Sequence, residues 1–340
     1  MEIIYEETLE QTADSIEALS QDVFACATYQ LLERESEEVQ AERTGSVMMY
    51  IIEDDHVVKR LQTLKTNAIL DMKWHRTGSQ KMLTTADSKG EVHFYSEKEN
   101  MLVEKALLVV DENVLCLSAD WYRNTDNPEK VAYSMSSGDL ALVQLVESEP
   151  VVVKTWKAHS LEAWIIACDY ANSDVFYSGA DDCLLKIWDL RTGVERACIT
   201  SKRHSMGVCS IQAHPTREHI FCSGSYDELV YVWDNRTMKC PISEIATGGG
   251  VWRLKWHPHG KDQLLAACMH NGYKVIGYNN GGLNNPAIEL SYEKHKSLAY
   301  GVDWCLGLSQ TNNGSCKSTA GLIASCSFYD NLLTVWKTAL

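Results

Sequence analysis

Two histidines precede two aspartates by the same distance in the middle of the chain. His159 lies 23 residues before Asp182, and His204 lies 23 residues before Asp227. A histidine held against a carboxylate suits general acid–base chemistry, in which the imidazole takes or gives a proton near neutral pH. The same pair also occurs as a buried hydrogen-bond network that fixes a fold when every member has a partner. We favour the structural interpretation for both pairs.

The segments that contain these aspartates repeat each other. Ser178-Gly179-Ala180-Asp181-Asp182 is followed by Trp188-Asp189, and Ser223-Gly224-Ser225-Tyr226-Asp227 is followed by Trp233-Asp234. The two tryptophans are 45 residues apart. A period of about 40–45 residues with a histidine and a Trp-Asp signature is typical of WD40 repeats, in which each repeat forms one blade of a β-propeller.

In a WD40 blade, the histidine is expected to join the loop before the innermost strand to the turn that holds the aspartate, and the tryptophan commonly joins the same network. His295 and Asp330 predict a third pair, separated further by an insertion in the last blade. Functional residues should then lie on the face where the loops that enter the innermost strands converge on the central channel.

The whole chain fits one closed propeller. Apolar runs at regular intervals predict an all-β fold, a seven-bladed WD40 β-propeller over residues 1–340, with residues 1–10 supplying the strand that closes the ring. Six or eight blades are alternatives because blades one, three and six have weak signatures. Residues 33–43 and 309–319 are expected to be mobile loops.

The composition limits the classes of function. The 340 residues are 45% hydrophobic and 23% charged, and no apolar run approaches the roughly 20 residues that cross a bilayer. The acidic start of the chain lacks the basic region of a signal peptide, so we expect a cytoplasmic protein with reduced cysteines. The net charge of −15 disfavours nucleic acid as a partner and is compatible with a cationic one.

Three aromatic residues recur in the loops that should surround the channel mouth. Trp164, Trp252 and Tyr300 occupy comparable positions in three blades, and Glu162 and Asp303 place negative charge nearby. Aromatic faces backed by carboxylates suit a quaternary ammonium group, through cation–π attraction of about 0.5–2 kcal/mol per contact. The alternative is that these aromatic residues only pack the channel rim.

One further histidine lies outside the repeated pairs. His270, in the turn Met269-His270-Asn271-Gly272, is expected on the same face and is a better general-base candidate than His159. The chain has no G-x-S-x-G, H-E-x-x-H, P-loop or Rossmann fingerprint. We expect no metal ion and no cofactor.

The loops, taken together, resemble one WD40 family, the diphthine methyl ester hydrolases of diphthamide biosynthesis. The resemblance runs from about residue 68 to residue 304, and residues 1–67 and the C-terminal insertion are only loosely similar. The matching segments are 68–74, 159–164, 201–212, 217–220, 224–228, 249–258, 265–270, 300–301 and 303–304.

This resemblance implies hydrolysis of the methyl ester of methylated diphthine, a modified histidine of translation elongation factor 2, with release of methanol and diphthine. The protein substrate would be the partner of a monomeric enzyme. The substrate carries a trimethylammonium group next to the ester, which makes the carbonyl more reactive. We expect Trp164, Trp252 and Tyr300 to hold this group, with Glu162 and Asp303 adding charge.

The catalytic roles are hypotheses that leave alternatives open. His270 or His204 is the expected general base, and the nucleophile is water or the side chain of Ser205 or Cys209. The oxyanion has three sets of candidate donors, which are Arg203, Arg253, and the backbone amides of Gly248, Gly249 and Gly250. The rival function is a non-enzymatic adaptor that binds protein partners on the same face.

Overall fold

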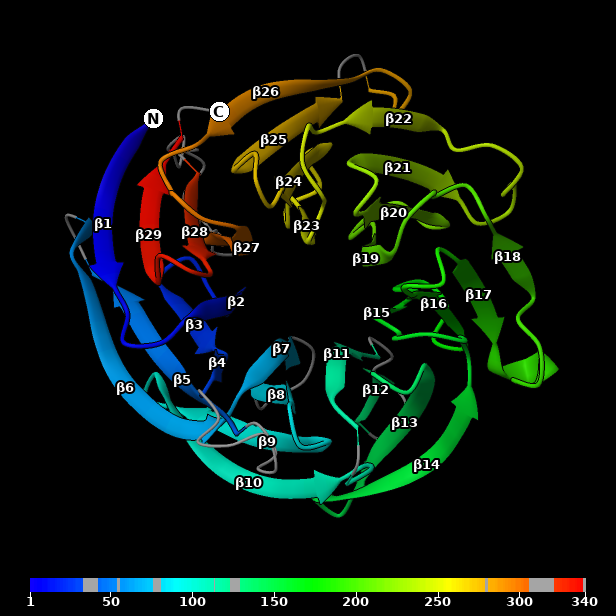
Figure 1. The fold of residues 1–340 in the computed structure, drawn as a ribbon, viewed down its shortest axis with the longest axis horizontal. Helices are drawn as coiled ribbons and strands as arrows, with labels where there is room; N and C mark the ends of the chain where they lie inside the picture. Colours follow the sequence, from blue (N-terminus) through cyan, green and yellow to red (C-terminus); the bar gives the residue numbers. More distant parts are fainter. Residues whose placement is uncertain are drawn as a thin grey trace, which may run out of the picture.

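Seven antiparallel sheets form a ring in the computed structural model (Figure 1). The predicted seven-bladed propeller is therefore confirmed, and the segments described contain no α-helix and no helix long and apolar enough to cross a membrane. The structure describes residues 1–32, 42–53, 56–75, 81–112, 114–122, 129–278, 281–305 and 321–338.

In each blade the first strand lies nearest the centre and the later strands follow outward, except that in blade one β5 pairs with β3 and carries both β4 and β6 on its outer side. Blade one consists of β2 (Ala13–Ala18), β3 (Val23–Thr28), β4 (Gln30–Leu31), β5 (Arg43–Ile52) and β6 (Val58–Asn67). Blade two consists of β7 (Ile69–His75), β8 (Met82–Asp87), β9 (Glu91–Lys98) and β10 (Met101–Val109). Blade three consists of β11 (Cys116–Trp121), β12 (Lys130–Met135), β13 (Asp139–Val146) and β14 (Glu149–Lys157).

The second half of the ring repeats this order. Blade four consists of β15 (Ile165–Cys168), β16 (Val175–Gly179), β17 (Leu185–Asp189), the 3₁₀ turn η2 (Leu190–Thr192) and β18 (Ile199–Ser201). Blade five consists of β19 (Val208–Ala213), β20 (Ile220–Ser225), β21 (Leu229–Asp234) and β22 (Ser243–Ala246). Blade six consists of β23 (Arg253–Trp256), β24 (Gln263–Ala267), β25 (Tyr273–Tyr278) and β26 (Pro286–Tyr292).

The two ends of the chain meet in blade seven. This blade consists of β27 (Ala299–Cys305), β28 (Leu322–Ser327), β29 (Leu332–Lys337) and, as its outermost strand, β1 (Glu2–Thr8). Strand β1 pairs antiparallel with β29, from Glu2 opposite Lys337 to Thr8 opposite Leu332. The N-terminal strand therefore closes the ring, as predicted, and gives β29 a partner on its outer edge.

The hydrophobic core lies between neighbouring blades. One buried cluster joins blades seven and one, and includes Phe24, Tyr50 and Val335. A second cluster joins blades three and four around Phe176 and Trp188. Because each blade buries both of its faces against its neighbours, the loops at the channel mouth are held by the whole ring.

The repeated histidines serve this framework. His159 Nδ1 lies 3.0 Å from Asp182 Oδ1, and His159 Nε2 lies 2.7 Å from the Ser178 hydroxyl. That hydroxyl also accepts the indole N–H of Trp188 at 2.8 Å. Burial lowers the pKa of His159 against the opposing effect of Asp182, so a neutral imidazole satisfies the network. The structural interpretation of this pair is confirmed.

The third predicted pair is indirect. His295 Nδ1 bonds the Ser327 hydroxyl, which in turn donates to the carboxylate of Asp330. The turn from Ser325 to Asp330 has one residue more than the turn from Ser223 to Asp227, and this extra residue moves the carboxylate out of reach.

The two predicted mobile loops lie almost entirely outside the described residues. Of residues 33–43, the structure describes only Glu42 and Arg43, and Arg43 is the first residue of β5. Residues 309–319 are all outside the described part. The cysteines that the structure describes are free thiols.

Candidate functional site

Three blades bring the predicted aromatic residues together at the mouth of the channel. Trp164 precedes β15, Trp252 precedes β23, and Tyr300 lies in β27. The ring centroids of Trp164 and Trp252 are 5.6 Å apart in an edge-to-face arrangement, and those of Trp252 and Tyr300 are 4.6 Å apart and stacked. All three side chains are half-buried. The expected gathering of these residues is therefore observed.

Two more aromatic residues extend this group. Tyr226 lies 6.3 Å from Trp252 and Phe328 lies 5.1 Å from Tyr300, measured between ring centroids. We call the five residues the aromatic cluster. Sequence reasoning missed Tyr226 and Phe328, although both occupy the turn between the second and third strands of their blades, at the position before or near the repeated aspartate.

The carboxylate at the aromatic cluster is that of Asp181. Its Oδ1 accepts the indole N–H of Trp164 at 3.3 Å, and its side chain is exposed. Gly207 makes room for this contact, because a Cβ at that position would come within 2.5 Å of Asp181 Oδ1 and 3.0 Å of the Tyr226 ring. Asp181 is equivalent to Tyr226 in the repeat, so aligning the two turns would have located it.

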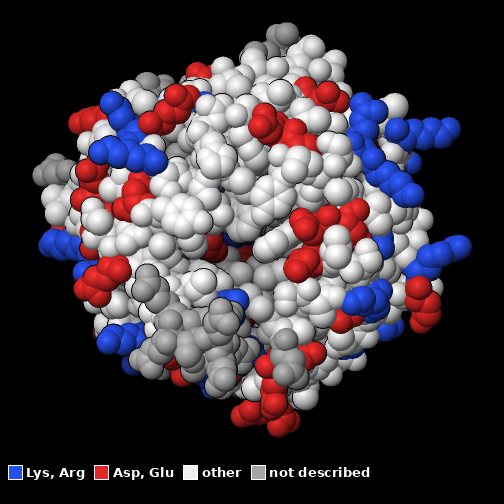
Figure 2. Space-filling view, in the orientation of Figure 1, with Lys and Arg blue, Asp and Glu red and all other residues white. Residues whose placement is uncertain are grey.

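Acidic side chains gather beside the central opening on one face of the ring. Figure 2 shows this face, with acidic side chains beside the central opening over blades four and five, and with acidic and basic atoms inside the opening. The carboxylates of Asp181, Asp182 and Asp227 lie close enough to raise the pKa of the Cys183 thiol, after the larger effect of burial. Glu162 belongs to the same loop region, since its carbonyl accepts the Asp181 amide at 2.9 Å.

Asp303 does not lie at the aromatic cluster. It follows Tyr300 along β27 toward the opposite end of the channel, where its Oδ2 accepts the Ala18 amide at 3.0 Å and lies 3.4 Å from Lys255 Nζ. A strand advances about 3.3 Å per residue, so a carboxylate three residues further on is separated from the cluster by about 10 Å. The predicted role of Asp303 beside the ammonium is corrected on this ground.

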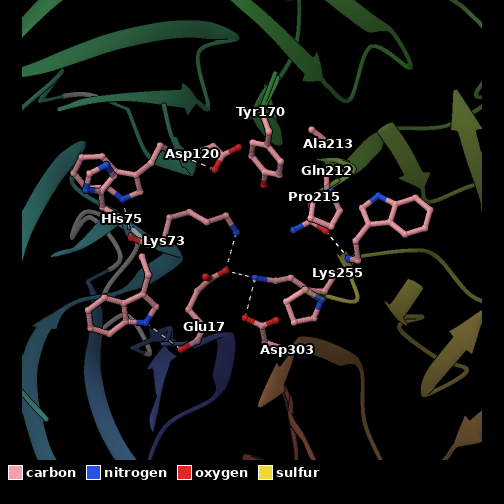
Figure 3. A pocket seen from close by; sticks show the side chains of 14 residues that line it. Glu17, Lys73, His75, Asp120, Tyr170, Gln212, Ala213, Pro215, Lys255 and Asp303 are labelled. Carbon is pink, nitrogen blue, oxygen red and sulfur yellow. Dashed lines mark hydrogen bonds and ion pairs between the residues drawn. The ribbon is translucent and has the colours of Figure 1, made fainter. Parts of the chain in front are cut away.

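The other end of the channel holds a cavity of about 220 Å³ (Figure 3). Glu17 accepts hydrogen bonds there from Lys73 at 2.8 Å and from Lys255. Asp120 accepts the Cys168 amide at 2.9 Å. These carboxylates join one blade to another, which accounts for the charges at this end without a ligand.

The candidates in blade five are held in other contacts. His204 is bonded at both ring nitrogens, to Asp227 Oδ2 at 2.9 Å and to the Ser223 hydroxyl at 2.8 Å, so it has no free nitrogen to accept a proton from water. Burial raises the pKa of the Cys209 thiol well above its usual range, which suppresses the thiolate that a nucleophile requires.

Arg203 and Ser205 flank His204 and are exposed. The Arg203 guanidinium lies 3.3 Å from Glu244 and 5.8 Å from the ring centroid of Tyr231, on the outer strands of blade five. The Ser205 amide donates to Asp227 at 2.9 Å. No contact joins either side chain to the aromatic cluster in the described residues.

The glycine loop before β23 packs against two neighbouring turns. A Cβ at Gly249 would come within 2.3 Å of the Cys268 carbonyl, and one at Gly250 within 2.8 Å of Met269 Sδ. The next two amides are already used, because Val251 donates to Ser225 and Trp252 donates to Ala267, both at 2.9 Å. The expected role of the Gly249 and Gly250 amides as oxyanion donors stays a prediction.

His270 lies on the same face but lines a separate hollow. It is exposed and shares a hollow of about 480 Å³ with Glu293, Lys296 and Tyr329. Tyr329 is adjacent to Phe328, with ring centroids 5.0 Å apart, so the hollow borders the aromatic cluster. The role of His270 as a base stays a prediction.

Three charged residues lie inside the channel below the aromatic cluster. Arg253 follows Trp252 and is buried, with Nη1 3.2 Å from Asp71 Oδ1. Asp14, in β2, is also buried and is within electrostatic range of both. Arg253 was predicted as a candidate oxyanion donor; the structure places it within the channel, and that role stays a prediction. Asp14 was missed because nothing in its sequence context distinguishes it from a strand residue.

One group in blade two has the residue types of a metal site. Asp87, Glu91 and His93 present ligand atoms within 4.8 Å of one another. The side-chain amide of Asn67 donates to Asp87 at 2.7 Å and to Glu91 at 2.8 Å, and His93 Nδ1 lies 2.7 Å from Glu104. These contacts join β8, β9 and β10 of blade two to Asn67 at the end of β6 in blade one, so the group has a structural explanation.

Comparison with known proteins finds the same repeat family and the same fold. The family described as WD domain, G-beta repeat matches residues 150–189 and 196–234. A chain in a solved structure of the mitotic checkpoint complex has a TM-score of 0.73 and 17% identity, covering 99% of this chain and 95% of that one. This likeness shows the propeller alone.

Closer relatives are found by sequence. A Dictyostelium discoideum protein named diphthine methyltransferase homolog is 35% identical, covering 96% of this chain and 97% of its own length. The human diphthine methyltransferase is 38% identical, over 87% of this chain and 73% of its own. The Schizosaccharomyces pombe diphthine methyltransferase is 30% identical, over 93% of this chain and 91% of its own.

Proposed function

This chain belongs to the diphthine methyltransferase family, and on that premise we propose that the aromatic cluster is where it binds methylated diphthine. The protein is a carboxylic ester hydrolase of diphthamide biosynthesis, which removes the methyl ester and releases diphthine and methanol. Its substrate is a protein, and we propose that this is translation elongation factor 2 in the cytoplasm, where translation takes place.

The observation that supports this site is the convergence of Trp164, Trp252 and Tyr300 from three blades beside the carboxylate of Asp181. The rings offer π faces to the trimethylammonium group, and the carboxylate adds a charge–charge attraction. The position at a channel mouth suits a substrate presented on a long side chain by a large protein. The exposed rim of the cluster admits the ammonium group without opening the ring of blades.

The chemistry asks little of the enzyme because the substrate is activated. The positive nitrogen on the α-carbon withdraws electrons from the ester carbonyl and stabilises the oxyanion that forms upon attack. The enzyme then has to hold the ester in place, activate water, and offer a donor to the oxyanion. Glu162 and His270 stay candidates for the first two tasks, and Arg253, Gly249 and Gly250 for the third.

The test uses purified protein and elongation factor 2 that carries methylated diphthine. Hydrolysis releases methanol in proportion to the enzyme's turnover and lowers the mass of the factor by one methylene group. Methyl transfer in the literal sense of the relatives' name would require a donor and would raise the mass. An unchanged mass with stable co-elution of the two proteins would favour the adaptor instead.

The same preparations settle the assembly state. We propose that the enzyme works as a monomer, since the aromatic cluster is complete within one chain. Light scattering during the reaction measures the molar mass of the active enzyme. A dimer as the active species would contradict the proposal.

A further inference from the structure

Charged residues from three different blades meet below the aromatic cluster. Asp14 belongs to blade one, Asp71 to blade two and Arg253 to blade six, and all three are buried. Asp14 and Asp71 each act electrostatically on Arg253. A residue of blade one can be close to residues of blades two and six at once only from a position that faces the channel. We call this group the channel triad.

The channel triad borders the aromatic cluster directly. Arg253 is the residue that follows Trp252. On the other side, Gly301 follows Tyr300 and packs on β2, where a Cβ would come within 2.8 Å of the Ile16 amide nitrogen. The charge of Asp14 raises the pKa of the Tyr300 hydroxyl, after the larger effect of burial. Asp14 and Arg253 therefore lie next to the two stacked rings of the cluster.

Asp14 and Arg253 differ from the other channel charges in their hydrogen bonds. Asp71 Oδ2 accepts the Ala119 amide at 3.2 Å, and so has a structural task between blades two and three. Neither the Asp14 carboxylate nor the Arg253 guanidinium forms a hydrogen bond within the described chain, and the approach of Arg253 to Asp71 is an ion pair. Both groups therefore keep hydrogen-bonding capacity that water or a substrate in the channel can use.

The substrate's own geometry brings its ester to these two groups. In methylated diphthine the ammonium nitrogen and the ester carbonyl carbon are attached to the same carbon atom. An ammonium group held at Trp252 and Tyr300 therefore places the ester immediately beside the rings. Solvent occupies one side of the cluster and the channel triad occupies the other.

From this arrangement we propose that the channel triad is the reaction site of the ester, with Asp14 as the general base and Arg253 as the donor to the oxyanion. The proposal rests on the proposed function, since it assigns the chemistry that follows binding at the aromatic cluster. Asp71 is a positioning residue that holds the guanidinium.

The reaction balances with water as the second reactant. Asp14 takes one proton from a water molecule while the water oxygen attacks the ester carbonyl carbon. The carbonyl electron pair moves onto oxygen, where Arg253 donates hydrogen bonds to it. As the carbonyl reforms, the bond to the methoxy group breaks and the methoxy oxygen takes the proton from Asp14. The products are methanol and the carboxylic acid of diphthine. The acid loses its proton to solvent, and Asp14 is ionised again because it has given its proton to the methoxy oxygen.

The protonation of Asp14 is suited to this task. Burial raises the pKa of its carboxyl to about 7, the positive charge of Arg253 opposes the rise, and Asp71 adds to it. Two further titratable groups on which Asp14 acts, Tyr300 and Cys326, stay protonated in this range because burial raises their pKa values. Asp14 is thus a base near neutral pH, where general-base catalysis is most effective.

The test compares variants in the release of methanol from two substrates, modified elongation factor 2 and the methyl ester of glycine betaine, which carries the same ammonium ester. Asp14→Asn should lower kcat by about 10²–10⁴-fold with KM changed less than about threefold. Asp22→Asn is the matched control, since Asp22 is an exposed acid of the same blade that bonds Ser20 at 2.7 Å. It should keep the wild-type rate.

The wild-type pH profile gives a second, independent readout. The value of kcat/KM should rise with pH and level off above about pH 7, and Asp14→Asn should remove this dependence. If Asp14→Asn does not fold, the wild-type profile decides, and a flat profile from about pH 5.5 to 8.5 would overturn the role of Asp14.

The failures of the two proposals are distinguishable. Wild-type protein that releases no methanol from the elongation factor overturns the proposed function and this inference with it. Active wild-type protein together with a fully active Asp14→Asn variant overturns only the inference. A KM effect without a kcat effect would make Asp14 a binding residue and would also overturn its role as the base.

Discussion

Trp252 stacks on Tyr300 with ring centroids 4.6 Å apart, although the two residues belong to different blades and lie 48 positions apart in the chain. The contact joins the loop before β23 to the start of β27 at the channel mouth. Trp252 is followed by Arg253, which faces the channel. Tyr300 is followed by Gly301, which packs on β2. The stacked pair therefore separates the solvent-exposed rim from the charges inside the channel.

Replacement of this ring tests whether the aromatic cluster recognises positive charge. Trp252→Leu keeps an apolar side chain but removes the π face, so KM for the methyl ester of glycine betaine should rise by about 2–30-fold. The neutral ester in which a tert-butyl group replaces the trimethylammonium group has the same shape. Its KM should hardly change, and equal losses for both esters would show that the ring only supplies apolar packing.

Neighbouring aspartates in one turn should have separable roles. Asp181→Asn removes the exposed carboxylate at Trp164, so KM for the cationic ester should rise by about 2–5-fold and become less sensitive to salt. Asp182→Asn removes the partner of His159 and should lower the stability by about 1–3 kcal/mol with little change in KM. The two variants are measured by steady-state kinetics and by thermal unfolding. An unstable Asp181→Asn with a normal KM would reverse the assignment.

The repeat in the sequence was sufficient to predict the propeller and the meeting of distant loops. The Trp-Asp signatures set the period, the period set the number of blades, and ring closure then placed Trp164, Trp252 and Tyr300 together. Asp181 was within reach of the same reasoning, because it is equivalent in the repeat to Tyr226. It was missed because the repeated aspartate that follows it, Asp182, is the residue that the repeat pattern singles out in this turn.

Other positions depend on three-dimensional detail that a single sequence does not contain. Asp303 is only three residues after Tyr300, which suggested that its charge lies beside the aromatic residues. Both residues lie in the strand β27, however, and the strand places the Asp303 side chain at the far end of the channel. Arg253 looks like a surface loop residue until its neighbours bury it. Burial raises the pKa of Asp14, and charges of blades two and six, which only ring closure brings to it, modify that rise.

Removal of the closing strand should weaken the whole ring. Deletion of residues 1–10 removes the outer partner of β29, exposes a strand edge, and should lower the unfolding temperature and promote association between chains. The measurements are thermal unfolding and size-exclusion chromatography. A peptide of residues 1–10 added in excess should restore part of the lost stability, because it can pair with the vacant edge. An unchanged unfolding temperature would contradict the closing role.

The acidity of Asp14 also predicts a stability effect of opposite sign to its effect on activity. The pKa of its carboxyl is raised from 3.8 in the unfolded chain to about 7, so the folded state holds an extra proton between these values. The ionised carboxylate therefore destabilises the fold progressively as pH rises through this window, by on the order of 2–4 kcal/mol above about pH 7. Asp14→Asn should unfold at a higher temperature than wild type at about pH 8, by roughly 2–6 °C, and the difference should vanish near about pH 4. Thermal unfolding at the two pH values measures both quantities.

The variant Asp22→Asn is the control, because the Asp22 carboxyl is exposed, and it should show neither change. Equal unfolding temperatures for wild type and Asp14→Asn at both pH values would mean that ionised Asp14 does not destabilise the fold.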